Sequence, residues 1–466
     1  MSWPTTLNIN AWNGVAPASA SISAQAMDWV TGTKQLRVTD SLAPPDDPDL
    51  ADWRNPGVGW GLILPERPGL TPVQLATGTD APEPIRQLLK ERNNAPIFRY
   101  RPDSPDRFTL LRNYAAGKDI SIDPAIPSGT QTDALPQYLL IYGSPAEIPW
   151  DFQYVLNATC AVGRLDLQGD ALANYIQALL NNWQHAASQI DQAVMWAVDF
   201  GAGDISHLMR NAIAATVYQA WSQDSTLHDK AVFFDGSTPG SLANAASLIA
   251  ALSAKKPALV VTTSHGQTGP LGDPAALKQK LGLPVDQDNK TLEPEQLLAT
   301  WEPDGAIWYA HACCSAGSDA ATIFDGLVDA GSPIDQVLKG VASLGAQVAP
   351  LPTALLGAKK PLRAFIGHVE PTFDWTLRQP STGQFLTNSL KRVLYNKVYM
   401  AQPIGLAFRE YYLPLGALSI QYDRAFQDFK NGKETHETML FCQLASRDLQ
   451  SMVILGDPTA VLPPLP

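Results

Sequence analysis

The sequence predicts an α/β protein in which a mostly parallel sheet is flanked by helices, preceded by an irregular and partly β N-terminal portion. From residue 137 onward, apolar runs of strand length alternate with segments of helical periodicity, as in repeated strand–helix units. The runs at 258–264 and 305–310 are continuously apolar, which is typical of parallel strands buried on both faces. Small and polar residues close both runs, so the two strand ends are well marked.

The amino-acid composition is that of a globular protein rather than a disordered one. The chain has 466 residues, of which 45% are hydrophobic and 17% charged, enough for one large domain with additions or for two to three domains. A net charge of -12 argues against a general nucleic-acid binder. The start Met-Ser-Trp-Pro-Thr-Thr lacks the features of a signal peptide, and no apolar run is long enough to cross a bilayer. With only four cysteines, we expect a cytoplasmic protein with free thiols, no cofactor and no membrane partner.

Residues 1–135 are expected to form a separate N-terminal region, irregular with some β structure, that packs on or regulates the rest. This part is rich in Pro, Gly, Asp and Thr. Residues 39–56 predict a loop because they combine prolines with aspartates. Residues 60–64 predict a strand, and residues 82–93 a short helix.

Residues 136–466 are expected to form the main domain. Apolar runs predict strands at 138–142, 160–167, 193–198, 231–234, 258–264, 305–310, 346–349 and 452–455. Helical spacing of apolar residues predicts helices at 172–183, 206–221, 239–253, 319–330, 333–340 and 385–394.

The ends of two of these strands carry reactive side chains. His265-Gly266 follows the first, and the second runs into His311-Ala-Cys-Cys-Ser-Ala-Gly317, which contains Cys313 and Cys314. Chemistry in an open parallel sheet collects where strands reach their carboxyl ends. A neutral imidazole there is a general base, a thiolate is a nucleophile, and neighbouring small residues let a substrate approach. Gly266 N–H and the N–H of the nucleophile are candidates for an oxyanion hole.

These strand ends resemble those of clan CD cysteine peptidases, which include caspases, legumains, metacaspases, separases, CHAT-domain proteases and gingipains. The gingipain family fits best. Three further segments are similar to its pattern over roughly 137–460: 138–143 with Ile148-Pro149, 161–165, and 455–459. The resemblance implies a caspase-like fold and a cysteine endopeptidase that works through a Cys-His dyad and a thioester, with His265 as base and acid. Its substrate would be a protein or peptide.

The chain also departs from gingipains. They are secreted and carry an immunoglobulin-like tail, whereas this sequence shows no export signal and stops shortly after Gly456-Asp-Pro458. We therefore expect an intracellular relative, closer to caspases and CHAT proteases. By resemblance, it would be switched on by a protein partner or by cleavage and would serve antiviral defence or cell death in bacteria.

The resemblance leaves the nucleophile open. A Cys-x-x-Gly pattern after the strand selects Cys314 with Gly317, and we favour Cys314. The polar-Ala-Cys pattern of caspases and legumains selects Cys313 instead, with His311 in the position that lines the specificity pocket. If Cys314 attacks, His311 is a supporting or core histidine.

Two aspartates and two rival functions complete the expectations. Asp199 and Asp235 follow predicted strands and are candidates to orient His265 or to bind a basic substrate side chain, although acids at such positions more often cap helices. Adjacent cysteines chelate zinc poorly, so no metal site is expected. The rival functions are a catalytically silent caspase-like binding scaffold and a non-peptidase thiol hydrolase or acyltransferase.

Overall fold

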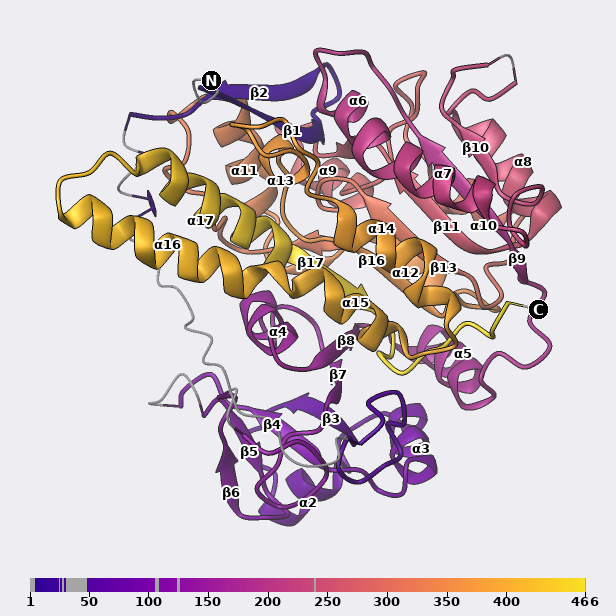
Figure 1. The fold of residues 1–466 in the computed structure, drawn as a ribbon. Helices are drawn as coiled ribbons and strands as arrows, with labels where there is room; N and C mark the ends of the chain where they lie inside the picture. Colours follow the sequence, from indigo (N-terminus) through magenta and orange to yellow (C-terminus); the bar gives the residue numbers. More distant parts are fainter. Residues whose placement is uncertain are drawn as a thin grey trace.

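The structure is a computed structural model that describes residues 5–24, 26, 29–30, 48–104, 109–123, 126–238 and 240–465. Much of the expected loop at 39–56 lies outside the described residues. A twelve-stranded, mostly parallel sheet runs through the molecule (Figure 1). In spatial order its strands are β10 (Val232–Phe234), β9 (Gln189–Ala197), β11 (Pro257–Thr263), β13 (Ile307–His311), β16 (Ala364–His368), β17 (Met452–Leu455), β8 (Ala161–Leu165), β7 (Tyr138–Tyr142), β3 (Trp60–Pro65), β4 (Ile97–Tyr100), β5 (Leu111–Asn113) and β6 (Lys118–Ile120).

The sheet departs from parallel pairing in two places. β16 pairs with β17 in the antiparallel sense, and β4, β5 and β6 form an antiparallel extension at one end. β11 and β13, which carry the candidate dyad, are parallel neighbours near the other end. Every residue of both strands is buried, as their continuously apolar sequences predict.

Helices flank the sheet, and in Figure 1 α14 and α15 cross in front of it while α16 and α17 run side by side. The helices are α2 (Pro72–Thr77), α3 (Glu83–Glu91), α4 (Trp150–Asn157), α5 (Gly169–Leu180), α6 (Ile205–Met209), the π-helix η1 (Arg210–Ala214), α7 (Ala215–Gln223), α8 (Ala245–Lys255), α9 (Pro274–Lys280), α10 (Pro294–Leu298), α11 (Pro333–Ala342), α12 (Pro350–Leu356), α13 (Asp374–Leu377), α14 (Asn388–Tyr395), the 3-10 helix η2 (Lys397–Tyr399), α15 (Ile404–Tyr412), α16 (Pro414–Lys430) and α17 (His436–Ser451).

The N-terminal portion is divided between two places. β3 to β6 extend the main sheet beyond β7, so pairing continues across the expected boundary near residue 135. A hairpin of β1 (Thr6–Trp12) and β2 (Pro17–Ser21) lies at the opposite end of the molecule in Figure 1. There β1 pairs in parallel with the two-residue strand β12 (Gly266–Gln267), which directly follows His265.

One expected helix is wrong. Residues 319–330 form turns, with Gly326 at a φ of 85° that helical backbone does not adopt. Their backbone bonds to the N-terminal segment instead: Ser23 N–H donates to the Leu327 carbonyl at 3.2 Å, and the Trp29 indole donates to the Ile323 carbonyl at 2.8 Å. The segment makes these long-range hydrogen bonds in place of the helical ones that its apolar periodicity predicted. β14 (Gly317–Ser318), which precedes this segment, pairs with β15 (Gln347–Val348), which follows α11.

Two glycines hold the centre of the sheet together by backbone contact. A Cβ on Gly163 would lie 2.1 Å from the Gly456 carbonyl oxygen, so β8 and the end of β17 approach too closely for any side chain. Beside them, the fully buried Arg164 guanidinium donates to the Gly143 and Ile148 carbonyls at 3.0 and 2.7 Å and joins β8 to the β7–α4 loop. The segments at 138–143, 161–165 and 455–459 thus pack on one another.

Candidate active site

The two reactive strand ends lie side by side. β11 and β13 pair with Thr263 opposite His311, and Ser264 N–H donates to the His311 carbonyl at 3.3 Å. β13 ends at His311, and Ala312, Cys313 and Cys314 follow it in a bend and turn, so the residues after Ser264 and after His311 come to the same edge of the sheet. A Cβ on Gly266 would lie 2.0 Å from the Cys313 carbonyl oxygen, which shows how closely the two backbones meet.

An acid that sequence reasoning missed holds His265. Nε2 of His265 lies 2.9 and 3.0 Å from the two carboxylate oxygens of Asp204, and the imidazole is fully buried. Within the described part of the chain, Nδ1 has no hydrogen-bond partner. The Phe200 ring stacks on the imidazole at 5.7 Å between centroids. A carboxylate on Nε2 favours the proton there, so the lone pair of Nδ1 is free to accept a proton.

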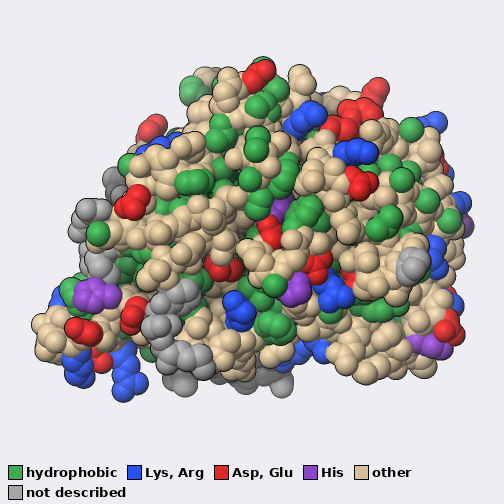
Figure 2. Space-filling model, turned by 90° about the horizontal axis from the view of Figure 1, so that it is seen from above, with side chains coloured by type: hydrophobic (Ala, Val, Ile, Leu, Met, Phe, Trp, Pro, Cys, Tyr) green, Lys and Arg blue, Asp and Glu red, His purple; other side chains and the backbone are tan. Residues whose placement is uncertain are grey.

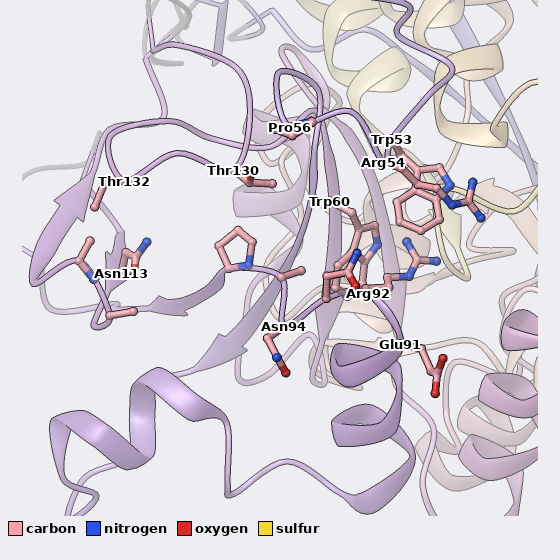
Figure 3. A pocket seen from close by; sticks show the side chains of 15 residues that line it. Trp53, Arg54, Pro56, Trp60, Glu91, Arg92, Asn94, Asn113, Thr130 and Thr132 are labelled. Carbon is pink, nitrogen blue, oxygen red and sulfur yellow. Dashed lines mark hydrogen bonds between the residues drawn. The ribbon is translucent and has the colours of Figure 1, made fainter.

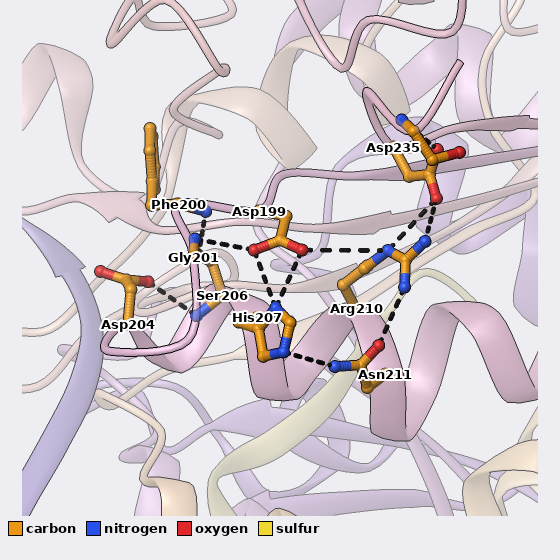
Figure 4. A network of polar contacts seen from close by, with 10 residues as sticks. Asp199, Phe200, Gly201, Asp204, Ser206, His207, Arg210, Asn211 and Asp235 are labelled. Atoms are coloured by element: carbon orange, nitrogen blue, oxygen red, sulfur yellow. Dashed lines mark hydrogen bonds and ion pairs between the residues drawn. The ribbon is translucent and has the colours of Figure 1, made fainter.

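Asp204 is placed by the start of a helix. It is the N-cap of α6, and its carboxylate accepts a hydrogen bond from Ser206 N–H at 2.7 Å (Figure 4). Burial acts to raise the pKa of Asp204, but the hydrogen bond and charge of His265, together with Ser206, bring that pKa below its ordinary value. Asp204 is therefore a carboxylate. The only sequence signal for it was an acid just before an apolar helical segment, which is also the ordinary signature of a cap.

The two cysteines have different surroundings, although both are fully buried. The Cys313 thiol contacts the Asn10 side-chain oxygen, which comes from β1. Cys314 has a φ of 55°, and its N–H donates to the Glu370 carbonyl at 3.5 Å. Burial raises the pKa of both thiols well above the ordinary value, with the neighbouring Cys314 adding to the effect on Cys313 and Glu370 adding to that on Cys314.

Glu370 is itself unusual. It is buried, and burial together with the nearby Asp319 raises its pKa to about 8. A carboxyl beside Cys314 opposes formation of a thiolate there once the carboxyl ionises. The close approach of Gly266 to the Cys313 backbone and the carboxyl beside Cys314 both favour Cys313 as the nucleophile, whereas the sequence favoured Cys314.

His311 faces an interior polar cluster. Its Nδ1 lies 2.8 Å from the Tyr309 hydroxyl, and its ring packs edge-on against His368 at 4.9 Å between centroids. Burial lowers the pKa of His311 to about 3, so the ring is neutral. His368 in turn lies 3.7 Å from the Asp448 carboxylate. This setting is that of a core histidine, the interpretation that the sequence paired with Cys314 as nucleophile, and it does not match the pocket position that the caspase and legumain pattern gave His311 beside Cys313.

Asp199 and Asp235 share a partner, Arg210, and their contacts lie there rather than at His265. Figure 4 shows Arg210 between them: the guanidinium pairs with Asp235, and its Nε lies 4.0 Å from Asp199. Asp199 also accepts from His207 Nδ1 at 3.0 Å. Although burial acts to raise it, hydrogen bonds from Ser237 and Arg210 bring the pKa of Asp235 below its ordinary value. Asp204, five residues after Asp199 in the same loop, makes the contact with His265 for which Asp199 and Asp235 were candidates.

The N-terminal strand β1 lies over the candidate pair His265 and Cys313. The Trp12 ring lies 6.2 Å from His265 and 5.9 Å from Phe200, between centroids. Asn8, Asp204, Asp374 and Arg378 line a cavity of about 200 Å³ beside it. Burial raises the pKa of Asp374 to about 6, and its Oδ2 accepts from the Asn8 amide at 3.3 Å. Seen from above in Figure 2, basic and acidic side chains are interspersed with hydrophobic ones on this face.

A cavity of about 500 Å³ lies far from the dyad, against β3 and β4 (Figure 3). Arg92 stacks on Trp53 and Trp60 beside it, at 4.2 and 4.4 Å from their ring centroids, and pairs with Asp457 at 3.3 Å. The guanidinium thus makes structural contacts, although its Nη1 has no hydrogen-bond partner among the described residues, and none of the candidate site residues lines this cavity.

Comparison with protein-family models, with curated proteins and with solved structures found no match to this chain. In the part of the chain that the structure describes, no three His, Cys, Asp or Glu side chains converge in a way that would hold a metal ion. No helix among the described residues is long and apolar enough to cross a bilayer.

Proposed function

We propose that this protein is a cysteine endopeptidase of the caspase-like type, with Cys313 as nucleophile, His265 as general base and acid, and Asp204 as the residue that orients His265. The observation that carries the proposal is the pair of adjacent strand ends: Gly266, next to His265, approaches the Cys313 backbone too closely for a Cβ, and the carboxylate on Nε2 leaves Nδ1 of the imidazole free. This arrangement supplies a nucleophile, a base and an orienting group, the set that covalent catalysis needs.

The chemistry follows from that arrangement. Nδ1 of His265 takes the thiol proton as the Cys313 sulfur attacks the peptide carbonyl, and Asp204 stabilises the imidazolium that forms. The N–H groups of Gly266 and Cys313 stabilise the oxyanion. The C–N bond then breaks, the imidazolium gives its proton to the leaving amine, and a thioester remains. Water, deprotonated by the same imidazole, hydrolyses the thioester and restores the thiol.

Separate alanine substitutions at His265, Cys313 and Cys314, assayed with a mixed peptide library, test the proposal. We expect Cys313→Ala and His265→Ala to abolish cleavage and Cys314→Ala to retain it. Cys160→Ala is the matched control, since Cys160 is a buried free cysteine in a different hydrophobic cluster. Retained cleavage in Cys313→Ala with loss in Cys314→Ala would reassign the nucleophile. If the protein cleaves no peptide even when the N-terminal strand β1 has been displaced from the site, the peptidase proposal is refuted.

A catalytically silent scaffold is the second candidate, favoured by the complete burial of His265 and both thiols. The two candidates differ in thiol reactivity. A peptidase in its open state reacts with a peptidyl electrophile at Cys313 and loses that reaction in His265→Ala. A scaffold would react at neither cysteine, or would react equally with and without the imidazole.

A further inference from the structure

We infer that β1 lies in the groove that an extended peptide substrate occupies, so that the N-terminal hairpin competes with substrate within the same chain. This inference rests on the proposed function and adds how that site is regulated and what shape of substrate it takes. The hairpin is defined here as residues 6–21, which form β1 and β2.

Alternate side chains of β1 engage the candidate site one after another. Asn8 donates to Asp374 at the cavity beside Asp204, the Asn10 oxygen contacts the Cys313 thiol, and Trp12 packs on His265 and Phe200. Successive side chains of a strand point to opposite faces, so residues two apart share a face. The intervening Leu7, Ile9 and Ala11 are fully buried in a hydrophobic cluster. One face of β1 thus follows the site as a bound peptide would.

The backbone of β1 is held in the manner of an added strand. Ala11 pairs with Gly266 and Trp12 with Gln267, and Thr268 N–H donates to the Trp12 carbonyl at 2.9 Å. β1 also makes an isolated antiparallel bridge from Ile9 to Phe373, and β2 pairs with the edge of β1 away from β12. Main-chain pairing of this kind is independent of sequence, so an extended peptide can form the same bonds once β1 leaves.

Access to the thiol requires that departure. His265 and Cys313 are both 0% exposed, and the Asn10 amide lies at the thiol where a scissile carbonyl must come. The Asn10 oxygen is further held by Thr372 N–H at 3.3 Å. The partner strand β12 has only two residues, so few main-chain bonds join β1 to the strand beside His265.

A reversible disulfide tests whether the hairpin must move. Ile22, just after β2, forms an isolated antiparallel bridge with Val328, and such facing residues are close enough for a disulfide. In the Ile22→Cys, Val328→Cys double variant, we expect oxidation to suppress both peptide cleavage and alkylation of Cys313 by iodoacetamide, and reduction to restore both. The two single variants and the wild type, oxidised in the same way, are the controls.

Loosening variants test the opposite direction. Asn10→Ala and Trp12→Ala remove contacts with Cys313 and His265. Because a minor open state is typically populated at about 0.1–10%, we expect either variant to speed alkylation of Cys313 by about tenfold or more. Val15→Ala is the matched control, since Val15 is 84% exposed in the hairpin turn and should leave the rate unchanged. A synthetic peptide of residues 6–12 should inhibit cleavage by Trp12→Ala, and a scrambled peptide should not.

The outcomes separate the two proposals. Equal cleavage by the oxidised and reduced forms of the double variant would overturn the hairpin as a competitor and leave the peptidase standing. Alkylation that responds to the lock, without cleavage of any peptide by the loosened variants, would overturn the peptidase and leave the hairpin as a cover over an inactive thiol.

Discussion

Replacement of Asp204 by asparagine tests the dyad most directly, because it removes one charge and little else. The carboxylate makes two contacts with His265 Nε2, at 2.9 and 3.0 Å, and its side chain is 7% exposed. A hydrogen bond to a charged group contributes about 1.5–3 kcal/mol. Losing it from the imidazolium-like transition state should lower kcat/KM by about 10- to 150-fold, at about 1.4 kcal/mol per factor of ten.

The amide has a second effect that can enlarge this loss. Its NH₂ group can donate to Nε2, which would move the imidazole proton to Nδ1 and block the atom that must accept the thiol proton. An acid-to-amide change of this kind in a serine protease triad costs about 10⁴-fold. Asp204→Ala cannot trap that tautomer, so we expect Asp204→Asn to be at least as impaired as Asp204→Ala.

Folding and activity can be separated in this experiment. Asparagine caps helices about as well as aspartate, so the thermal midpoint of Asp204→Asn should stay near that of the wild type, whereas Asp204→Ala should lose about 1 kcal/mol. Peptide turnover by an opened variant background, such as Trp12→Ala, gives the rates. Asp199→Asn is the control, since Asp199 bonds to His207 and Arg210 instead. Activity of Asp204→Asn within about twofold of its parent would refute the orienting role, since even the weakest bond of this class is worth about tenfold.

The remaining predictions concern stability. Because burial and Asp319 raise the pKa of Glu370 to about 8, the native state keeps a proton that the unfolded chain releases above about pH 4.5. The contribution of this protonated carboxyl to the free energy of unfolding is therefore fully present at low pH, and it falls as the pH rises toward 8 by at most about 1.4 kcal/mol per pH unit. Glu370→Gln should flatten the pH dependence of urea denaturation in that window. An unchanged slope would contradict this. Arg164→Met leaves buried carbonyls without donors and should cost about 3 kcal/mol in the same assay, against little for the exposed Arg86→Met. Gly163→Ala forces a methyl group against the Gly456 carbonyl and should cost about 1–3 kcal/mol, seen as a lower thermal midpoint; an unshifted midpoint would show that β8 can move aside.

The strand ends were predictable because their signal is local. A continuous apolar run reports burial on both faces, and the residue that stops it marks the edge of the sheet. β11 and β13 are neighbours in the sheet, so His265, which follows one strand, and Cys313, which follows the other, come to the same edge of the sheet. The order of strands and the antiparallel pairing of β16 with β17 depend on contacts between distant segments, and β16 was not expected at all.

Asp204 shows why the third group was harder to find. Asp199 ends β9 more directly, and both acids precede the same helical segment. Which carboxylate reaches His265 depends on the path of the loop between them. The Asp199 side chain turns to Gly201 N–H, at 2.8 Å, and to His207, while Asp204 is carried to the imidazole by the first turn of α6. Sequence places both acids near the strand end but does not give the direction of either side chain.

The N-terminal strand illustrates a more general limit. Residues 6–12 alternate between apolar and polar side chains, a pattern that ordinarily predicts a strand with one face on the core and one in water. Here Asn10 is 0% exposed, because the polar face lies on Cys313 instead of solvent. A strand that covers a polar site and a strand that faces water therefore have the same periodicity. Only a partner far along the chain, Gly266 beside His265, distinguishes them, and that pairing is the reason we infer a regulatory role for the hairpin.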